Sequence, residues 1–264
     1  MRGAGALTLE IVDLRIAFGD RRVVELGRLE LGNGEILGLA GESGSGKSVT
    51  ALAVIGLAST LGARVEGSVR LDGEELVGAP ERRLREIRGS RVAMIFQSPV
   101  ASLDPLLQVG ELFERTLRLH GASRTEAADR TEAALREVLL SPDLRSRHPH
   151  QLSGGQAQRV AIAMALALRS EVLIADEPTS ALDVTVQAEI LDLLRRLREE
   201  RGMSILFISH DLAVIAELCD RVAVMERGRI VEDGPTARVL GEPADPYTRR
   251  LVAAVPKIGA AAVQ

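Results

Sequence analysis

Residues 41–48 read GESGSGKS, and two apolar runs flank them: ILGLA at residues 36–40 and VTALAVIGLA at residues 49–58. The stretch matches the pattern GxxxxGK[ST] in full and lies between a candidate strand and a candidate helix, as the mechanism of that pattern requires. Glycines let consecutive backbone N–H groups curl around an anion, and the N-terminus of the following helix adds a partial positive charge. The stretch therefore predicts a phosphate-binding loop, or P-loop, at the end of a buried strand.

The side chains of this loop indicate that its ligand is a nucleotide with a magnesium ion. Lys47 would reach the β- and γ-phosphates, and the Ser48 hydroxyl would bind Mg²⁺. The loop residues that we expect to contact the nucleotide are Gly41, Ser43, Gly44, Ser45, Gly46, Lys47, Ser48 and Val49.

Polar residues also end three other apolar runs. Asp176 and Glu177 follow VLIA, Gln97 follows VAMIF and His210 follows ILFIS. Because ligands of open α/β sheets gather at the carboxyl ends of the strands, we expect these side chains to face the P-loop. Asp176 is placed to hold Mg²⁺, and Glu177, which points to the other side of the strand, is the candidate general base. Gln97 can bind Mg²⁺ or the attacking water, and His210 can form a hydrogen bond with the γ-phosphate. Together with Lys47, these residues predict a nucleotide hydrolysis site.

The hydrophobic pattern changes along the chain and predicts an α/β fold. Residues 7–35 alternate apolar and polar, which indicates antiparallel strands, whereas later short apolar runs alternate with helical stretches, as in a parallel sheet. VAVMERGRIVEDG reads as a hairpin that turns at Arg227 and Gly228. The strand signal disappears between Gln97 and Arg169. We therefore expect one domain over residues 1–264, with an N-terminal antiparallel β subdomain and an α-helical subdomain inserted at about residues 98–165.

Composition excludes several classes of protein. The net charge is −4, and the chain has one Tyr, no Trp and four Phe, which argues against nucleic acid as the main ligand because such binders usually carry basic patches and stacking aromatics. No apolar run approaches the ~20 residues of a membrane span, and the N-terminus does not resemble a secretory signal. A single cysteine, Cys219, excludes an intramolecular disulfide. We expect a cytoplasmic protein.

A second glycine-bearing stretch, LSGGQ at residues 152–156, directly precedes an apolar helix. Ser153 can cap that helix, whose exposed N–H groups would form another anion site. One P-loop with one extra anion site predicts a head-to-tail dimer, in which LSGGQ of one copy covers the γ-phosphate held by the other. ATP would then join the two subunits, with the partner's contacts coming from Ser153, Gly154, Gly155 and Gln156.

On these motifs the chain resembles the ABC-type ATP-binding subunits, a P-loop NTPase family defined by the LSGGQ signature. The resemblance covers nearly the whole chain. It implies that residues 41–48 are the Walker A motif, Gln97 the Q-loop residue, Asp176 and Glu177 the Walker B pair and His210 the switch histidine. Phe18, 23 residues before Gly41, resembles the aromatic residue that stacks on adenine in this family.

Longer motifs resemble one branch of that family, the ATPase subunits of dipeptide, oligopeptide and nickel importers. They are GESGSGKS, SLDP at residues 102–105, EPTSALDVTVQAEIL at 177–191 and DPYTRRLVAAVP at 245–256. The last lies in a C-terminal family tail at about residues 240–256. The sequence departs from the branch at Ser98, Ala157 and Asp245. It ends at Gln264, before the cysteine-bearing extension of longer peptide-importer subunits, and this short length favours a nickel- or metallophore-type member.

The resemblance also implies partners. These are transmembrane permease subunits, which would dock near residues 98–109, a second ATPase subunit in a homo- or heterodimer, and indirectly an extracytoplasmic solute-binding protein. The chain would then lie on the inner face of the cell membrane. Three alternatives stay open: a subunit of a non-transport assembly such as phosphonate breakdown, a soluble ATPase acting on nucleic acid or ribosomes, and a small-molecule P-loop kinase.

Overall fold

Two sheets organise the computed structural model, which describes residues 7–180 and 182–254. One is antiparallel, with the strand order β2-β1-β4-β5; the other has six strands in the order β10-β9-β3-β8-β7-β6. The strands of the first sheet are β1 (Leu7–Phe18), β2 (Arg21–Gly32), β4 (Ala63–Leu71) and β5 (Glu74–Glu75). The strands of the second are β3 (Ile36–Ala40), β6 (Val92–Ile95), β7 (Val172–Asp176), β8 (Ser204–Ser209), β9 (Arg221–Glu226) and β10 (Arg229–Pro235).

The six-stranded sheet confirms the predicted α/β fold. Strands β9, β3, β8, β7 and β6 run parallel. Every residue of β3, β7 and β8 is buried, because both faces of the sheet are covered, and this explains the continuous apolar runs in the sequence. β9 and β10 form the predicted antiparallel hairpin. Its turn residues Arg227 and Gly228 both have positive φ angles, 49° and 85°, as a tight hairpin turn requires.

Alternating side chains of each buried strand enter two separate cores. Leu173 and Ala175 pack toward helices on one face, whereas Ile174 packs toward α1 and the antiparallel sheet on the other. The helices on the first face include α7 (Val184–Arg201), α8 (Leu212–Leu218) and α9 (Thr236–Gly241), and α1 spans Lys47–Val54. The antiparallel sheet predicted for the N-terminal region is thus present, and it gains β4, which the alternation over residues 7–35 did not include.

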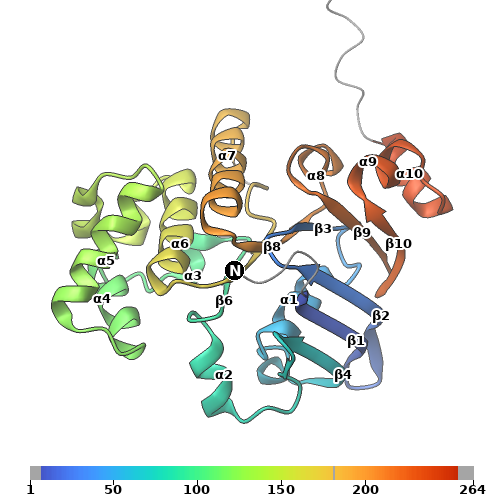
Figure 1. Cartoon of the computed structure of the whole chain (residues 1–264), viewed down its shortest axis with the longest axis horizontal. Coiled ribbons are helices and arrows are strands. Elements are labelled where there is room, and N and C mark those ends of the chain that lie inside the picture. Colours follow the sequence, from blue (N-terminus) through green and yellow to red (C-terminus); the bar gives the residue numbers. More distant parts are fainter. Residues whose placement is uncertain (1–6, 181, 255–264) are drawn as a thin grey trace, which may run out of the picture.

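Helices fill the segment between β6 and β7, for which the sequence predicts a helical subdomain. They are α3 (Pro99–Ser102), α4 (Val109–Leu119), α5 (Arg124–Glu137) and α6 (Gly154–Leu168), with 3₁₀ turns at Pro142–Ser146 and Pro149–Gln151. Figure 1 shows α4, α5 and α6 grouped on the opposite side of the molecule from the antiparallel strands. Among residues 7–180 and 182–254, no helix combines the length and the apolar character that crossing a bilayer requires.

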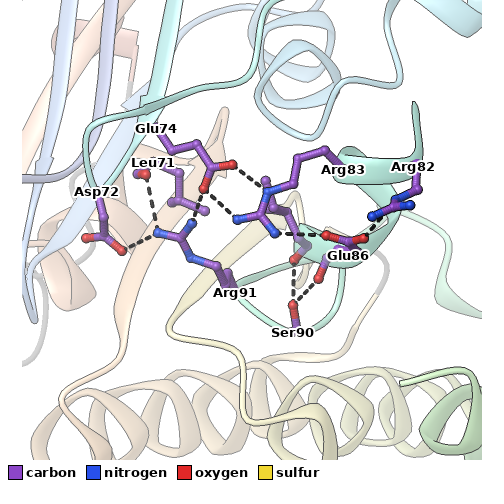
Figure 2. A network of polar contacts seen from close by, with 9 residues as sticks. Leu71, Asp72, Glu74, Arg82, Arg83, Glu86, Ser90 and Arg91 are labelled. Atoms are coloured by element: carbon purple, nitrogen blue, oxygen red, sulfur yellow. Dashed lines mark hydrogen bonds and ion pairs between the residues drawn. The ribbon is translucent and has the colours of Figure 1, made fainter. Parts of the chain in front are cut away.

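A charged network ties the antiparallel sheet to β6 (Figure 2). Arg91, the residue before β6, donates hydrogen bonds to Asp72, Glu74 and the Leu71 carbonyl oxygen. Arg83, on α2 (Glu81–Ile87), binds Glu74 as well as Glu86 on its own helix. The network thus holds the start of β6, the strand that leads to Gln97.

Candidate functional site

The P-loop joins β3 to α1 in a conformation that requires glycine. Gly41 has a φ angle of 150°, and a Cβ atom there would lie 2.2 Å from the Met225 carbonyl oxygen. Gly46, which precedes the first residue of α1, has a φ angle of 107°. Residues with a side chain rarely adopt such angles, so the two glycines allow the backbone to wrap around the start of the helix.

Lys47 lies inside this loop with its ammonium group on the loop backbone. Its Nζ atom donates to the carbonyl oxygens of Gly41 and Glu42, at 2.7 and 2.9 Å, and lies 3.4 Å from the Ser45 hydroxyl oxygen. Burial lowers the pKa of Lys47 below its usual value, and the negative charges of Glu177 and Asp176 partly offset that effect. The longest of these contacts, to Ser45, is the one that a phosphate oxygen can most easily replace while the hydrogen bond to Gly41 is kept.

Asp176, the last residue of β7, lies next to the start of α1. Ser48 donates a hydrogen bond to Asp176, with Oγ 3.1 Å from Oδ1. Burial raises the pKa of the Asp176 carboxyl group, whereas the hydrogen bond from Ser48 lowers it. Hydroxyl and carboxylate oxygens are the ligands that Mg²⁺ prefers, so the residues present fit the predicted metal.

Glu177 is held between two other strand ends. Its Oε2 atom lies 2.9 Å from Nδ1 of His210 and accepts a hydrogen bond of 3.4 Å from Nε2 of Gln97. Its backbone N–H donates to the Ile208 carbonyl oxygen. Glu177 has a φ angle of 47°, a left-handed conformation that costs a residue with a side chain about 1–3 kcal/mol. Such strain is common at functional sites, where the surrounding structure enforces it.

One cleft of about 670 Å³ unites most of these groups, although its described lining does not include Ser45 or Asp176. Its described lining residues are Arg21, Val23, Gly41, Glu42, Ser43, Gly44, Gly46, Lys47, Ser48, Val49, Gln97, Glu177, His210 and Leu251. The strand ends that the sequence grouped by topology thus lie beside the P-loop. The sequence did not predict Arg21, Val23, Glu42 or Leu251 as site residues, although Glu42 lies within the P-loop motif and Leu251 within the tail motif that resembles the importer branch. The catalytic and ligand roles of all these residues stay predictions.

Two predicted groups lie elsewhere. Of the described residues, those that line the cleft do not include Phe18, which is half-buried and packs against the core between the sheets. Arg21 and Val23 of β2 do line the cleft. The signature residues Ser153 and Gly154 are exposed at the start of α6, and the same lining set does not include them. The predicted contacts of Phe18 with adenine and of the signature with a partner's nucleotide stay predictions.

The start of α6 has the predicted cap. Ser153 Oγ accepts a hydrogen bond from the Gln156 N–H, and the Gln156 side chain accepts one from the Ser153 N–H. A Cβ atom at Gly155 would lie 2.5 Å from Cγ1 of Val186, whereas one at Gly154 would meet nothing closer than 3.4 Å. The second glycine of the signature therefore lets α6 approach the start of α7.

Comparisons with known proteins assign the family. The family model described as "ABC transporter" matches residues 27–180. A putative peptide import ATP-binding protein of Brucella abortus is 46% identical over 250 residues, which cover 94% of this chain and 75% of the relative. The oligopeptide transport ATP-binding protein OppD of Salmonella typhimurium is 46% identical over 258 residues, which cover 95% of this chain and 76% of the relative. The glutathione import ATP-binding protein GsiA of Salmonella paratyphi A is 48% identical over 88% of this chain, which spans 39% of that longer relative.

Solved structures support the same family. CbiO1 of Clostridium perfringens, part of an ABC transporter complex, superimposes with a TM-score of 0.78 at 27% identity, over 90% of this chain and 92% of that one. The ATP-binding cassette MJ0796, in a dimeric post-hydrolysis state with ADP and Pi, gives a TM-score of 0.74 at 29% identity, over 86% and 98%. The chain belongs to the ABC transporter family, and it is an ATP-binding and ATP-hydrolysing subunit of the importer type.

Proposed function

We propose that this chain pairs with a second ATPase subunit around ATP, and that closing and reopening of the pair drives peptide uptake through separate transmembrane subunits. The observation that carries the proposal is the cleft in which Gln97, Glu177 and His210 meet the P-loop. Import ATP-binding proteins for peptides, oligopeptides and glutathione, all at least 46% identical to this chain, support the class of cargo. Nickel, which the sequence left open, is the less supported cargo.

The hydrolysis chemistry follows from the contacts of Glu177. Its carboxylate lies beside the P-loop, where it can accept a proton from the attacking water. Gln97 and His210 fix its Oε2 atom at 3.4 and 2.9 Å, so the base is oriented before the reaction. Lys47 would bind the β- and γ-phosphates. Mg²⁺, when bound by Ser48, Asp176 and Gln97, would neutralise charge on the phosphates.

A second subunit would complete each site. Ser153 and Gly154 are exposed, whereas the helix that they start is mostly buried. An exposed helix N-terminus is suited to bind an anion, and the γ-phosphate held by a partner is the anion that we propose for it. Each site then needs residues of both subunits, and an isolated subunit would hydrolyse ATP slowly because one preorganised group is worth about 10²–10³ in rate.

The surface that follows Gln97 suits a membrane partner. Val100 and Leu106 are exposed apolar residues, at 37% and 83%, within the predicted docking segment at residues 98–109. Val100 follows Gln97, which contacts Glu177, by three residues, so a cytoplasmic helix of a permease that docks on this segment would sense the state of the site. The chain would therefore lie peripherally on the inner face of the membrane, and a solute-binding protein outside the cell would deliver the cargo.

Peptide uptake by the native host tests the proposed function. A strain that lacks this gene should lose uptake of a radiolabelled tripeptide, and the wild-type gene should restore it, whereas Glu177→Gln should not. Nickel uptake, measured in the same strains with ⁶³Ni²⁺, should not change. If the strain lost nickel uptake but kept peptide uptake, the proposed cargo would be nickel instead of peptides. Normal uptake of both would contradict a role of this chain in their transport.

A further inference from the structure

The C-terminal helix α10 (Pro246–Ala254) touches the P-loop directly. The backbone N–H of Glu42 donates a hydrogen bond of 3.0 Å to the hydroxyl of Tyr247. Tyr247 is 5% exposed, and the Arg250 guanidinium lies 5.5 Å from the centre of its ring. Leu251, one turn further along, lines the nucleotide cleft. The tail motif thus forms part of the wall of this site, a role that family membership alone did not give it.

A single peptide group connects Tyr247 to Lys47. The peptide between Gly41 and Glu42 presents its N–H to the Tyr247 hydroxyl and its carbonyl oxygen to Nζ of Lys47, at 3.0 and 2.7 Å. On the Gly41 side, the backbone packs so closely on Met225 that a Cβ atom would not fit. Rotation of this peptide would break both hydrogen bonds together, so the tyrosine and the lysine are mechanically linked.

The start of α10 is itself fixed, which keeps the hydroxyl in place. Glu232, a buried residue of β10, accepts hydrogen bonds from the backbone N–H groups of Ala244 and Asp245, at 3.0 and 3.1 Å. The Asp245 carboxylate then accepts the Tyr247 N–H at 2.7 Å. A tyrosine hydroxyl is neutral at physiological pH, and burial raises the pKa of Tyr247 further, so this residue adds no charge beside the phosphates.

We propose that Tyr247 is a positioning residue for phosphate binding: its hydroxyl holds the peptide between Gly41 and Glu42 in the orientation that aims Lys47 at the phosphates. The tyrosine acts through the loop and does not touch the ligand. The inference rests on the proposed function in one respect, that the ligand is ATP held by Lys47. Family members without a tyrosine at this place would need another acceptor for the same N–H group.

Tyr247→Phe tests the proposal because it removes the hydroxyl and keeps the ring. We expect ATP, ADP and inorganic pyrophosphate to bind about two- to tenfold more weakly, the effect of one lost hydrogen bond, and by a similar factor for all three because the change lies at the phosphates. Isothermal titration calorimetry measures the affinities. Arg249→Gln, an exposed position of the same helix, is the matched control and should leave them unchanged.

Asp245→Ala separates positioning from general packing. It removes the cap of α10 without changing Tyr247, so it should weaken pyrophosphate binding in the wild-type background and have no further effect in Tyr247→Phe, because both changes act through one contact. Additive effects, or unchanged affinity in Tyr247→Phe, would overturn the inference. If Lys47→Ala also left ATP binding unchanged, the proposed function would fail instead, so the two failures are distinguishable.

Discussion

At the scale of a single residue, the burial of Asp176 affects the stability of the ligand-free protein. The carboxyl group lies at the end of a buried strand, and burial raises its pKa above the usual 3.8, an effect that Ser48 and Lys47 only partly offset. A group whose pKa is higher in the folded state stabilises the fold most fully below its unfolded pKa, and that contribution is lost as pH rises through the folded pKa. The ionised carboxylate therefore costs stability at neutral pH, and the Mg²⁺ that we propose for this site would offset that cost.

Asp176→Asn should consequently raise the melting temperature of the ligand-free protein at pH 7. The gain should shrink as pH is lowered toward 4, where the wild-type carboxyl group becomes neutral as well. In the wild type, MgATP should raise the melting temperature more than ATP alone. The variant should lose this difference, because an amide is a poorer magnesium ligand than a carboxylate. Differential scanning fluorimetry over pH 4–8, with and without MgATP, measures both effects. A lower melting temperature than wild type at pH 7 would contradict the account.

The sequence predicted where Asp176 and Glu177 lie but not how they are held. A run of four apolar residues that ends in two acids identifies a strand end, since both signals are local. The left-handed backbone of Glu177 and its contact with His210 depend on β8 lying beside β7, a pairing between segments far apart in the chain. Phe18 is a second case, because its spacing from the P-loop predicts a contact with adenine, whereas its packing against the core depends on its pairing with β2 and β4.

At the scale of elements, the second glycine of the signature motif lies where α6 and α7 pack too closely for a larger residue. Gly155→Ala would put a Cβ atom 2.5 Å from Cγ1 of Val186, and valine cannot rotate away easily because it is branched at Cβ. We expect a loss of about 1–3 kcal/mol in the free energy of unfolding, as for other overpacked sites. Chemical denaturation measures it.

Gly154→Ala is the matched control, because the nearest atom outside its own helix would be 3.4 Å away. It should leave the stability unchanged or raise it slightly, since alanine favours helices more than glycine. Val186→Ala in the Gly155→Ala background should restore part of the lost stability by removing the clashing methyl group. Equal stabilities of Gly154→Ala and Gly155→Ala would show that α6 and α7 do not meet as closely as described.

Elements whose signals are strong and local were predicted, and those that depend on distant partners were not. Local sequence patterns predicted the buried runs of β3, β7 and β8, the β9–β10 hairpin and the Ser153 cap. The strand β4, by contrast, has a mixed pattern of burial with Gly67 in its middle, and its pairing with β1 is what makes it a strand. The contact of α10 with the P-loop joins residues 205 positions apart, and no local pattern announces it.

At the scale of the whole molecule, the two stretches that we predict to bind anions lie apart. Residues 41–48 line the cleft, whereas the described lining does not include Ser153 or Gly154, which are exposed at the start of α6. A second subunit in head-to-tail orientation would bring the two stretches together around ATP. This arrangement is a prediction from two local motifs, and the motifs do not indicate whether the partner is identical.

The most direct test is the mass of Glu177→Gln in solution, measured by light scattering with and without ATP and Mg²⁺. This variant should bind ATP without hydrolysing it, so a site shared by two copies of this chain predicts that the mass rises from 28.3 kDa to twice that value when ATP is added. Lys47→Ala, which lacks the phosphate contact, should stay monomeric under the same conditions. A Glu177→Gln protein that binds ATP fully and remains a monomer would contradict the claim that two copies of this chain share their sites.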